Sequence, residues 1–254
     1  MLRDIIDFEK LLVIGTALRR FDLRFLEDCK IKNPELKIYC LLLNSVSSIT
    51  FSNYTIKSKF NSFPWDSVLT FDPIDARENN WRYIGLNYYS KHQMLGIEKI
   101  ENDIFFAGSI VGSRGDKIIE ILKYLSENSI SCEFMCPRVN KSQRSQDFPD
   151  GINLLRKRVS YSEILQKMLK SNCILEILQP GQGGGTLRYF EAVCYNKKLL
   201  TTNQRIKEYL FYNEKYMKIF SDFSDIDLNW IRKVEPIDYG YVDEFSPKYL
   251  KLDE

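Results

Sequence analysis

The chain has 254 residues, which is enough for one large domain or two small ones with a buried core. Hydrophobic residues make up 44% and charged residues 28%, as in a globular protein, and the formal net charge of +2 does not favour nucleic acid as a partner. No apolar run approaches the ~20 residues that span a bilayer, and residues 11–14 are too short a run for a signal peptide, so we expect a cytoplasmic protein.

The six cysteines, at positions 29, 40, 132, 136, 173 and 194, include no C-x-x-C pair. The one histidine, His92, is far along the chain from the two closest cysteines. This spacing does not fit a zinc site, and we expect reduced thiols that pack as small apolar side chains. We likewise interpret local pairs of lysines, such as Lys197 and Lys198, as solvated surface.

Short apolar runs alternate with longer polar segments in the first hundred residues. The runs have the length of buried strands and lie at residues 10–15, 37–43, 67–71 and 82–86. A helical segment at residues 21–29 separates the first two and ends before Asn33-Pro34. Asn44 follows the second strand, and Asp72-Pro73 stops the third. Strands that alternate with longer segments favour a parallel sheet.

The same alternation resumes after a charged, mixed stretch at residues 91–101. Strands are predicted at residues 103–108, 130–136, 173–178 and 199–202, and helices at residues 116–128 and 186–196 and after the capping box of Ser160 and Glu163. We therefore divide the chain into two Rossmann-like α/β domains with parallel sheets, residues 1–100 and 101–225. Residues 226–254 are expected to form a tail that packs back on the body.

The stretch from Cys173 to Asn203 is strand, glycine loop, helix, strand, which makes one βαβ unit. Ligands bind at the carboxyl ends of strands in open α/β sheets, where this loop lies. Gly183-Gly184-Gly185 lets backbone N–H groups approach a ligand closely, and the helix start at Thr186 adds unpaired donors. Arg188, one turn on, can present a planar fork to a phosphate. The stretch therefore predicts an anion-binding loop.

A second interpretation stays open, in which the loop is a flexible connection and Arg188 pairs with Glu191 on the helix surface. Glu176 inside an apolar strand, and Gln179 and Gln182 beside the loop, favour ligand binding, because buried polar groups need partners. An earlier loop, from Ser109 to Arg114, has Gly108, Gly112 and Gly115 around it. That spacing is looser than the dinucleotide fingerprint, so we do not expect NAD.

Residues 178–182, 186–188, 190–192 and 197–203 resemble bacterial GT-B glycosyltransferases from capsule and lipopolysaccharide gene clusters. In that family a glycine-rich loop and helix, with a glutamate before a small residue, hold the diphosphate and ribose of a nucleotide-sugar donor. The resemblance implies that Glu191 contacts the ribose and that Arg188 stabilises the leaving diphosphate. A second glutamate common in the family is absent, because position 183 is glycine, and Gln182 is the candidate replacement.

The resemblance extends to residues 105–109, which look like the start of the donor domain and imply donor contacts from Gly108, Ser109 and Arg114. Residues 39–45 and 70–75 resemble the acceptor domain. Asn44 stands where relatives often have an aspartate, and is a candidate catalytic position. The chain opens on what resembles the second strand of the family, so a leading strand and helix are expected to be absent.

The implied function is transfer of a sugar from a nucleotide-sugar donor to a surface glycan, free or lipid-linked, with no metal or other cofactor required. A nucleotide-sugar epimerase of the same architecture and a non-catalytic nucleotide-binding or scaffold subunit remain alternatives. His92 is a candidate general base, because imidazole titrates near neutrality, or else a surface residue in a linker.

Two further motifs are weaker. Asp225-Ile226-Asp227 spells the D-x-D motif that holds a divalent metal in the other glycosyltransferase fold class, but its polar surroundings before Trp230 indicate a helix cap. Residues 57–65 (KSKFNSFPW) mix basic and aromatic side chains, a combination that can dock on the anionic leaflet of the inner membrane. An ordinary surface loop is the interpretation that we favour for this segment.

Overall fold

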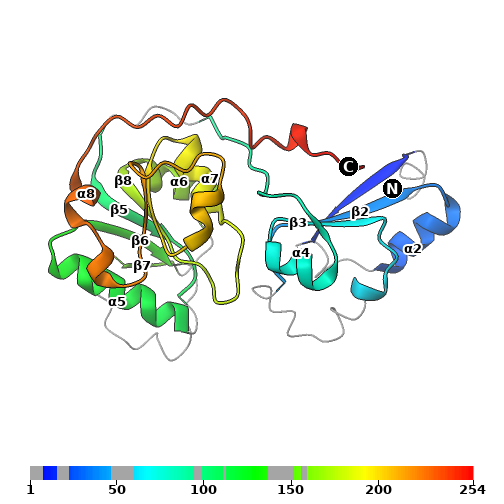
Figure 1. The fold of residues 1–254 in the computed structure, drawn as a ribbon, viewed down its shortest axis with the longest axis horizontal. Helices are drawn as coiled ribbons and strands as arrows, with labels where there is room; N and C mark the ends of the chain where they lie inside the picture. The colour runs from blue at the N-terminus through cyan, green and yellow to red at the C-terminus, as the bar shows by residue number, and fades with distance from the viewer. Residues whose placement is uncertain are drawn as a thin grey trace. The chain divides into compact units, whose positions relative to one another are not determined.

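The computed structural model describes residues 8–15, 23–46, 60–93, 99–110, 113–136, 152–155 and 159–253 (Figure 1). The chain divides into two compact units. Unit 1 comprises Met1–Tyr88, Pro180–Gly185 and Lys248–Glu254, and unit 2 comprises Tyr89–Gln179 and Thr186–Pro247. The limits expected from the sequence, at residues 100 and 225, do not coincide with unit boundaries, and the glycine loop and the last residues of the tail belong to unit 1.

Unit 1 is built on a parallel sheet, as the alternation of its segments predicted. Among its described residues, four strands pair in the order β1-β2-β3-β4. Their bounds are β1 Lys10–Ile14, β2 Lys37–Leu42, β3 Ser67–Thr70 and β4 Arg82–Tyr83. Neighbouring strands are all parallel, so their carboxyl ends lie along one edge. Asn44 follows β2 at that edge and is exposed.

Helix α4 (Pro73–Asn79) begins where the sequence predicted only the end of a strand. The Asp72 carboxylate accepts a hydrogen bond from the backbone N–H of Ile74 at 2.9 Å, and Pro73 has no N–H to leave unsatisfied in the first turn. Asn80 ends the helix in the left-handed conformation, with a φ of 53°. Asp72-Pro73 is therefore a helix start as well as a strand stop.

Helix α2 (Leu23–Lys32) covers one face of the unit 1 sheet. Its Leu26 and Cys29 are fully buried and join alternate residues of β2 in one apolar cluster. The opposite face of β2 packs with Leu250 and Leu252, near the end of the chain. The Leu252 carbonyl also accepts a hydrogen bond from Arg82 at 2.9 Å. Strand β2 is consequently buried on both faces.

The segment at residues 57–65 was interpreted as a surface loop, with membrane docking as the alternative, but its aromatic residues belong to the core of unit 1. Phe60 and Phe63 are only 3% and 5% exposed, and Trp65 packs partly buried against the same cluster. Lys57 and Lys59 lie outside the described residues. For Phe60 and Phe63 both interpretations are wrong, because buried rings neither form a surface loop nor insert into a leaflet.

Unit 2 contains the larger sheet. Among its described residues, six strands pair in the order β10-β9-β8-β5-β6-β7, and every pairing is parallel. Their bounds are β5 Asn102–Ala107, β6 Cys132–Cys136, β7 Ile152–Leu154, β8 Ser171–Glu176, β9 Lys198–Thr201 and β10 Met217–Ile219. The predicted α/β class with two parallel sheets is confirmed. The three-residue strands β7 and β10 were not among the predicted elements.

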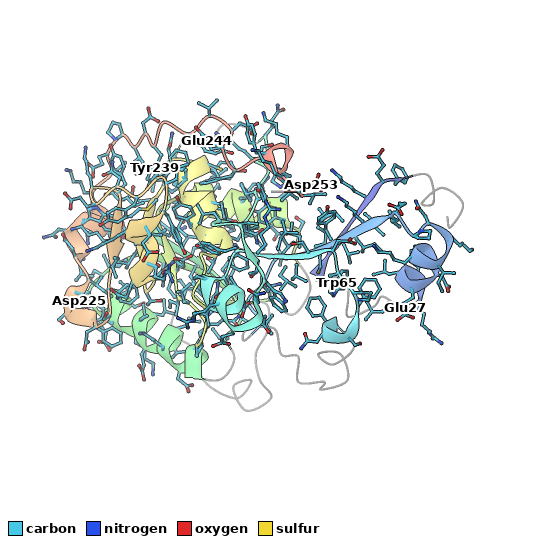
Figure 2. The ribbon with its side chains drawn as sticks, turned by 45° about the vertical axis from the view of Figure 1, so that its right-hand side comes forward. Glu27, Trp65, Asp225, Tyr239, Glu244 and Asp253 are labelled. Carbon is cyan, nitrogen blue, oxygen red and sulfur yellow. The ribbon has the colours of Figure 1, made fainter. Side chains whose placement is uncertain are left out.

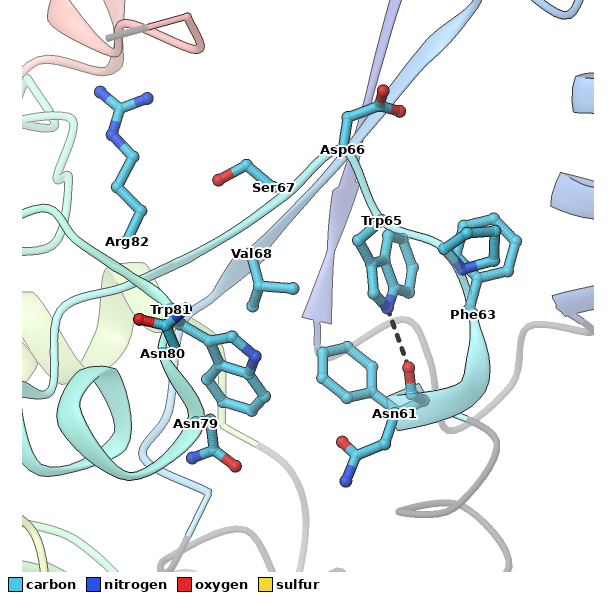
Figure 3. A pocket seen from close by; sticks show the side chains of 12 residues that line it. Asn61, Phe63, Trp65, Asp66, Ser67, Val68, Asn79, Asn80, Trp81 and Arg82 are labelled. Atoms are coloured by element: carbon cyan, nitrogen blue, oxygen red, sulfur yellow. Dashed lines mark hydrogen bonds between the residues drawn. The ribbon is translucent and has the colours of Figure 1, made fainter.

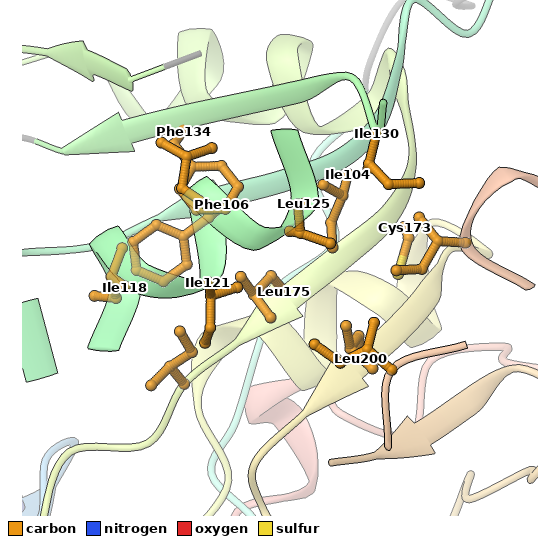
Figure 4. Packing of buried hydrophobic residues seen from close by; sticks show 14 of the residues in the cluster. Ile104, Phe106, Ile118, Ile121, Leu125, Ile130, Phe134, Cys173, Leu175 and Leu200 are labelled. Atoms are coloured by element: carbon orange, nitrogen blue, oxygen red, sulfur yellow. The ribbon is translucent and has the colours of Figure 1, made fainter. Parts of the chain in front are cut away.

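Helices cover both faces of the unit 2 sheet. They are α5 (Ser113–Glu127), α6 (Tyr161–Leu169), α7 (Leu187–Cys194) and α8 (Leu228–Arg232). On one face, Ile118 and Leu125 of α5 pack against alternate strand residues such as Phe106 and Leu175, and α8 extends the same cluster (Figure 4). Helices α6 and α7 pack on the other face, over β5, β8 and β9. Two-sided covering explains the nearly continuous apolar runs of these strands.

The six cysteines are free thiols, five of them buried and Cys132 half-buried. Their packing as small apolar side chains is thereby confirmed for the buried five. No helix within the described ranges is both long and apolar enough to cross a membrane.

Two lysines that were expected on the surface are buried in unit 2. Lys198 is fully buried, and its Nζ donates to the carbonyl of Trp230 at 2.7 Å. The Nζ of Lys197 donates to the carbonyls of Leu169 (2.6 Å) and Ser171 (2.7 Å). Because Leu169 is the last residue of α6, the ammonium stabilises a helix C-terminus. The surface interpretation is wrong because distant carbonyls supply the acceptors.

A pH-dependent contribution to stability follows from Lys197, whose pKa burial lowers to about 8. The unfolded amine titrates near ~10.4, so between these values the unfolded chain binds more protons, and folding becomes more favourable as the pH rises. We expect the unfolding free energy of the wild type, relative to Lys197→Met, to increase by about 2–3 kcal/mol from about pH 8 to about pH 10. Urea unfolding at several pH values measures this difference, and a flat difference would contradict a charged, desolvated Lys197.

Candidate functional site

The strand order of unit 2 reverses between β5 and β8, because β6 and β7 add on one side and β9 and β10 on the other. Ligands of open parallel sheets bind outside the carboxyl ends of the strands at such a reversal. Gly108 and Ser109 follow β5 there and are half-buried, and Gln179 follows β8 and is exposed. The structure thus brings three of the predicted residues to one edge.

Glu176, the last residue of β8, is fully buried and accepts three hydrogen bonds. Thr186 donates from its backbone N–H (3.1 Å) and its hydroxyl (2.6 Å), and Thr201 of β9 donates from its hydroxyl (2.5 Å). The carboxylate therefore ties the start of α7 to two strands. The charged residue in the apolar strand therefore has buried partners within unit 2, which are one backbone N–H and two threonine hydroxyls.

Helix α7 begins where the sequence predicted. Thr186 is the N-cap, and its hydroxyl accepts a hydrogen bond from the backbone N–H of Arg188 at 3.1 Å. The helix packs on β8 and β9, which fixes the first turn over the sheet. The Arg188 guanidinium carbon consequently lies 5.9 Å from the centre of the Phe105 ring, within range of a cation–π contact.

Arg188 and Glu191 form an ion pair, with 2.6 Å between Nη1 and Oε2. Only 11% of the Arg188 side chain and none of the Glu191 side chain is exposed, so this is a buried pair, not the helix-surface pair of the second interpretation. The Tyr161 hydroxyl donates to the other oxygen of Glu191 at 2.7 Å. Burial raises the pKa of Glu191, although Arg188 and Tyr161 lower it. One oxygen of Glu191 accepts from Tyr161, and the other contacts Arg188 as a close ion pair without hydrogen-bond geometry, so a ribose would have to displace one partner.

Arg114, in the first turn of α5, is the second cation at this edge. Its guanidinium lies over the Phe106 ring at 5.8 Å from the ring centre, and one of its Nη atoms is 3.1 Å from where a Cβ on Gly108 would be. Glycine at position 108 therefore permits the close approach of this arginine. Burial lowers the pKa of Arg114, and the charge of Arg188 acts in the same direction. Within the described part of the chain, the buried Nε of Arg114 makes no hydrogen bond.

The glycine loop belongs to unit 1, where it binds a carboxylate of the chain itself. Asp72 accepts hydrogen bonds from the backbone N–H groups of Gly183 (2.8 Å) and Gly184 (3.2 Å). The Gln182 side chain donates to the Gly184 carbonyl at 3.1 Å, and Gly185 is buried. In this structure the backbone N–H groups of the loop thus bind the carboxylate of Asp72.

The residues predicted to hold the donor are divided between the two units. Unit 2 contains Gly108, Ser109, Arg114, Gln179, Thr186, Arg188 and Glu191, and unit 1 contains Gln182, Gly183, Gly184 and Gly185. Within unit 2, the two arginines and Gly108 lie at the strand reversal. The donor role of both groups stays a prediction.

The Phe71 ring occupies the space beside Gly184. A Cβ at Gly184 would lie 2.5 Å from two ring carbons of Phe71 and 2.9 Å from its carbonyl oxygen. We expect Gly184→Ala to lower the free energy of unfolding by about 1–3 kcal/mol, measured by urea unfolding. The double variant Gly184→Ala, Phe71→Leu should lose less than the sum of the two single losses. If the two losses of unfolding free energy simply added, the clash with the Phe71 ring would not be the cause of the Gly184→Ala loss.

The two candidate bases lie in different units. His92, in unit 2, is exposed, and its ring stands edge-on to Tyr161 with 5.1 Å between ring centres. Asn44 lies in unit 1, and a catalytic role stays a prediction for both residues. Tyr161 was not singled out from the sequence, although it contacts both His92 and Glu191 and shares a 2.8 Å hydrogen bond with Tyr89. No local pattern marks Tyr161, because its partners are distant in sequence.

The acidic residues of the D-x-D motif act as caps, as predicted. Asp225, labelled in Figure 2, is the last residue of the 3-10 helix η4 (Phe223–Asp225). Its carboxylate accepts hydrogen bonds from the backbone N–H groups of Ser221 and Asp222, both at 2.9 Å. Asp227 is the N-cap of α8 and accepts from a backbone N–H of that helix at 2.9 Å. Among the described residues, no group of three or more His, Cys, Asp or Glu side chains is placed to hold a metal ion.

Comparison with known proteins finds solved structures whose folds are similar to that of this chain. No family model and no curated protein matches the chain. The glycotransferase of kitacinnamycin matches with a TM-score of 0.41 and 8% identity over 89% of this chain and 66% of its own. The spinosyn forosaminyltransferase SpnP matches with a TM-score of 0.41 and 9% identity over 91% of this chain and 68% of its own. The E. coli heptosyltransferase WaaC with ADP matches with a TM-score of 0.30 and 11% identity over 88% of this chain and 95% of its own. This chain spans about two thirds of the length of the first two.

Proposed function

We propose that this protein is a GT-B-type glycosyltransferase that moves a sugar from a nucleotide-sugar donor to a glycan acceptor. The observation that carries the proposal is the pair of arginines at the strand reversal of unit 2. Arg114 is half-buried, its buried Nε makes no hydrogen bond among the described residues, and Arg188 is held by Glu191. Desolvated cations need an anionic partner, and a diphosphate fits the forks of two arginines.

Glycosyl transfer from such a donor breaks the bond between the anomeric carbon and a phosphate oxygen. The bonding electrons stay on the phosphate, the acceptor oxygen bonds to the anomeric carbon, and the acceptor proton passes to a base. Negative charge therefore grows on the leaving diphosphate, where Arg114 and Arg188 would stabilise it. When Arg188 turns from Glu191 to the phosphate, the carboxylate becomes free to accept hydrogen bonds from the ribose. The two predicted roles are thus coupled through one ion pair.

Turnover with a panel of nucleotide sugars tests the proposal. A thermal-shift screen of UDP, GDP, CDP and ADP first identifies the nucleotide, because a ligand of the folded state raises Tm. We expect nucleoside diphosphate release that depends on an acceptor glycan and continues in the presence of EDTA. Isomerised sugar formed without an acceptor would instead identify the epimerase. Nucleotide binding with no turnover of any donor would indicate a non-catalytic subunit.

We further propose that the acceptor is a lipopolysaccharide or capsule glycan, free or lipid-linked, at the cytoplasmic face of the inner membrane. The resemblance of residues 173–203 to transferases of those gene clusters supports this. Membrane contact would depend on basic side chains, because Phe60 and Phe63 are buried. Co-sedimentation with liposomes tests the membrane part of the proposal. Recovery that does not change with anionic lipid content would remove it.

A further inference from the structure

A pocket of about 510 Å³ opens at the amino-terminal edge of the unit 1 sheet (Figure 3). It is lined by the segment before β3, by the first residues of β3, and by the end of α4 together with the start of β4. Asn44 and Asp72 lie at the opposite edge, beyond the carboxyl ends of the strands. The four residues of β3 separate the two edges by on the order of 10 Å. The pocket is therefore distinct from the strand edge at which ligands of such sheets bind.

Two of the three tryptophans in the chain, Trp65 and Trp81, line this pocket and are half-buried. The indole N–H of Trp65 donates to the Phe60 carbonyl at 3.0 Å, and its ring packs on Phe63 with 4.4 Å between ring centres. Trp81 stands edge-on to the Phe60 ring at 5.5 Å. These contacts hold both indoles in place while part of each remains accessible. The pocket thus offers pre-organised aromatic surface.

The polar groups around the indoles are mainly amides, which both donate and accept hydrogen bonds. Asn61 and Asn80 are exposed, and the Asn79 amide nitrogen donates to the Asp75 carbonyl at 2.9 Å, which leaves its oxygen as an acceptor. The charged lining residues are Arg82 and Asp66, which have opposite signs. Arg82 donates to a backbone carbonyl, and Asp66 pairs with Lys30 at 2.9 Å. Among the described lining residues these opposite charges balance, so this part of the lining offers a phosphate no excess positive charge.

We propose that this pocket binds a neutral hexopyranose residue of a glycan. A pyranose ring has an apolar C–H face, which suits the indoles, and a belt of hydroxyls that donate and accept, which suits the asparagines. The volume lies within the range of pockets that enclose small organic ligands. Sugar binding here goes beyond the proposed transfer reaction. If that reaction also holds, the pocket keeps a distal residue of an extended acceptor in place.

Titration of the full chain with the methyl glycosides of glucose, galactose, mannose and N-acetylglucosamine, without any donor, tests the proposal. We expect at least one glycoside to bind with Kd on the order of millimolar, detected by saturation-transfer NMR and by a change in tryptophan fluorescence. Trp81→Ala should weaken binding at least about tenfold, because it removes an aromatic face. Asn61→Ala, at an exposed position, should weaken binding several-fold with no loss of folding.

Asn229→Ala is the matched control, because Asn229 is exposed on α8 in unit 2. It should bind the glycosides as the wild type does. No binding of any of the four glycosides would overturn the proposal, as would binding that survives both pocket substitutions. AMP serves as a nucleobase probe, and a pocket that binds AMP but no glycoside would overturn it as well. Because donor turnover does not enter these measurements, failure of the transferase assignment would leave their result unchanged.

Discussion

Replacing Arg188 by alanine should lower turnover of the nucleotide sugar by about 100- to 1,000-fold, because the variant loses the guanidinium that stabilises the charge on the leaving diphosphate. The same change should lower the free energy of unfolding by about 3–5 kcal/mol, since it leaves the buried carboxylate of Glu191 without its cation. A helix-surface pair would cost only about 0.2–0.5 kcal/mol. Turnover assays and urea unfolding measure the two losses separately.

Matched variants keep the chemical and structural effects of this pair apart. Arg188→Lys retains a charge for Glu191 but lacks the planar fork, so it should recover more of the stability than of the turnover. Glu191→Ala should weaken donor and nucleoside diphosphate binding alike, because both contain the ribose. Folded Arg188→Ala protein that turns over donor within about threefold of wild type would rule out this site assignment.

The stability loss of Arg188→Ala should also depend on pH. Burial already raises the pKa of Glu191, and removal of the neighbouring cation should raise it further. A carboxyl group whose pKa is higher in the folded state retains its favourable contribution below the unfolded pKa of about 4.3, and loses it as the pH rises through the folded pKa. The difference in unfolding free energy between wild type and variant should therefore become smaller as the pH falls from about 7 toward about 4.5. A difference in unfolding free energy that grows as the pH falls would contradict the buried pair.

Glu176→Ala should produce the second large loss, about 3–5 kcal/mol in the free energy of unfolding. The change removes the acceptor of the Thr186 N–H and of two threonine hydroxyls, and each unsatisfied buried group costs about 1–3 kcal/mol. Hydrogen exchange at the Arg188 amide should accelerate, because Thr186 no longer holds the start of α7 against the sheet. Urea unfolding and exchange followed by NMR check the two effects.

Two glutamine variants serve as controls for this prediction. Glu176→Gln should lose less than Glu176→Ala, because the amide oxygen remains an acceptor. Glu163→Gln changes an exposed glutamate in the first turn of α6 and should stay within about 0.5 kcal/mol of wild type. If Glu176→Ala were as mild as Glu163→Gln, the carboxylate would not be the anchor of α7.

The elements that the sequence predicted best are those with local signals. The start of α7 follows from a threonine before an apolar helical face, and the same logic placed Ser160 at the start of α6. Helix α4 was missed because Pro73 stops a strand and also suits the first turn of a helix, and only the neighbouring Asp72 cap decides between these outcomes. Strands β7 and β10 have three residues each, too few to show a period of two.

The sequence indicated which residues of the candidate region are polar or charged, but it did not indicate which residues they contact. The unusual position of Glu176 indicated buried polar contacts, yet nothing local identifies Thr186 and Thr201 as the donors. The anion at the glycine loop is Asp72, which lies 111 residues before Gly183. Burial of Lys197 depends on carbonyls of another helix end. Contacts of this kind are set by tertiary packing, which a single sequence does not display.

Unit 1 is assembled from three separate segments of the chain, which has a consequence for its folding during synthesis. The chain passes between the units at residues 88–89, 179–180, 185–186 and 247–248, and Asp253 bonds to both Lys10 and Tyr39. At ribosomal rates, on the order of ten seconds separate synthesis of the first sheet from arrival of the residues that cover β2. During that interval Tyr39 and Leu41 lack their partners Leu250 and Leu252. A premature stop near residue 247 would therefore damage the first sheet to be synthesised.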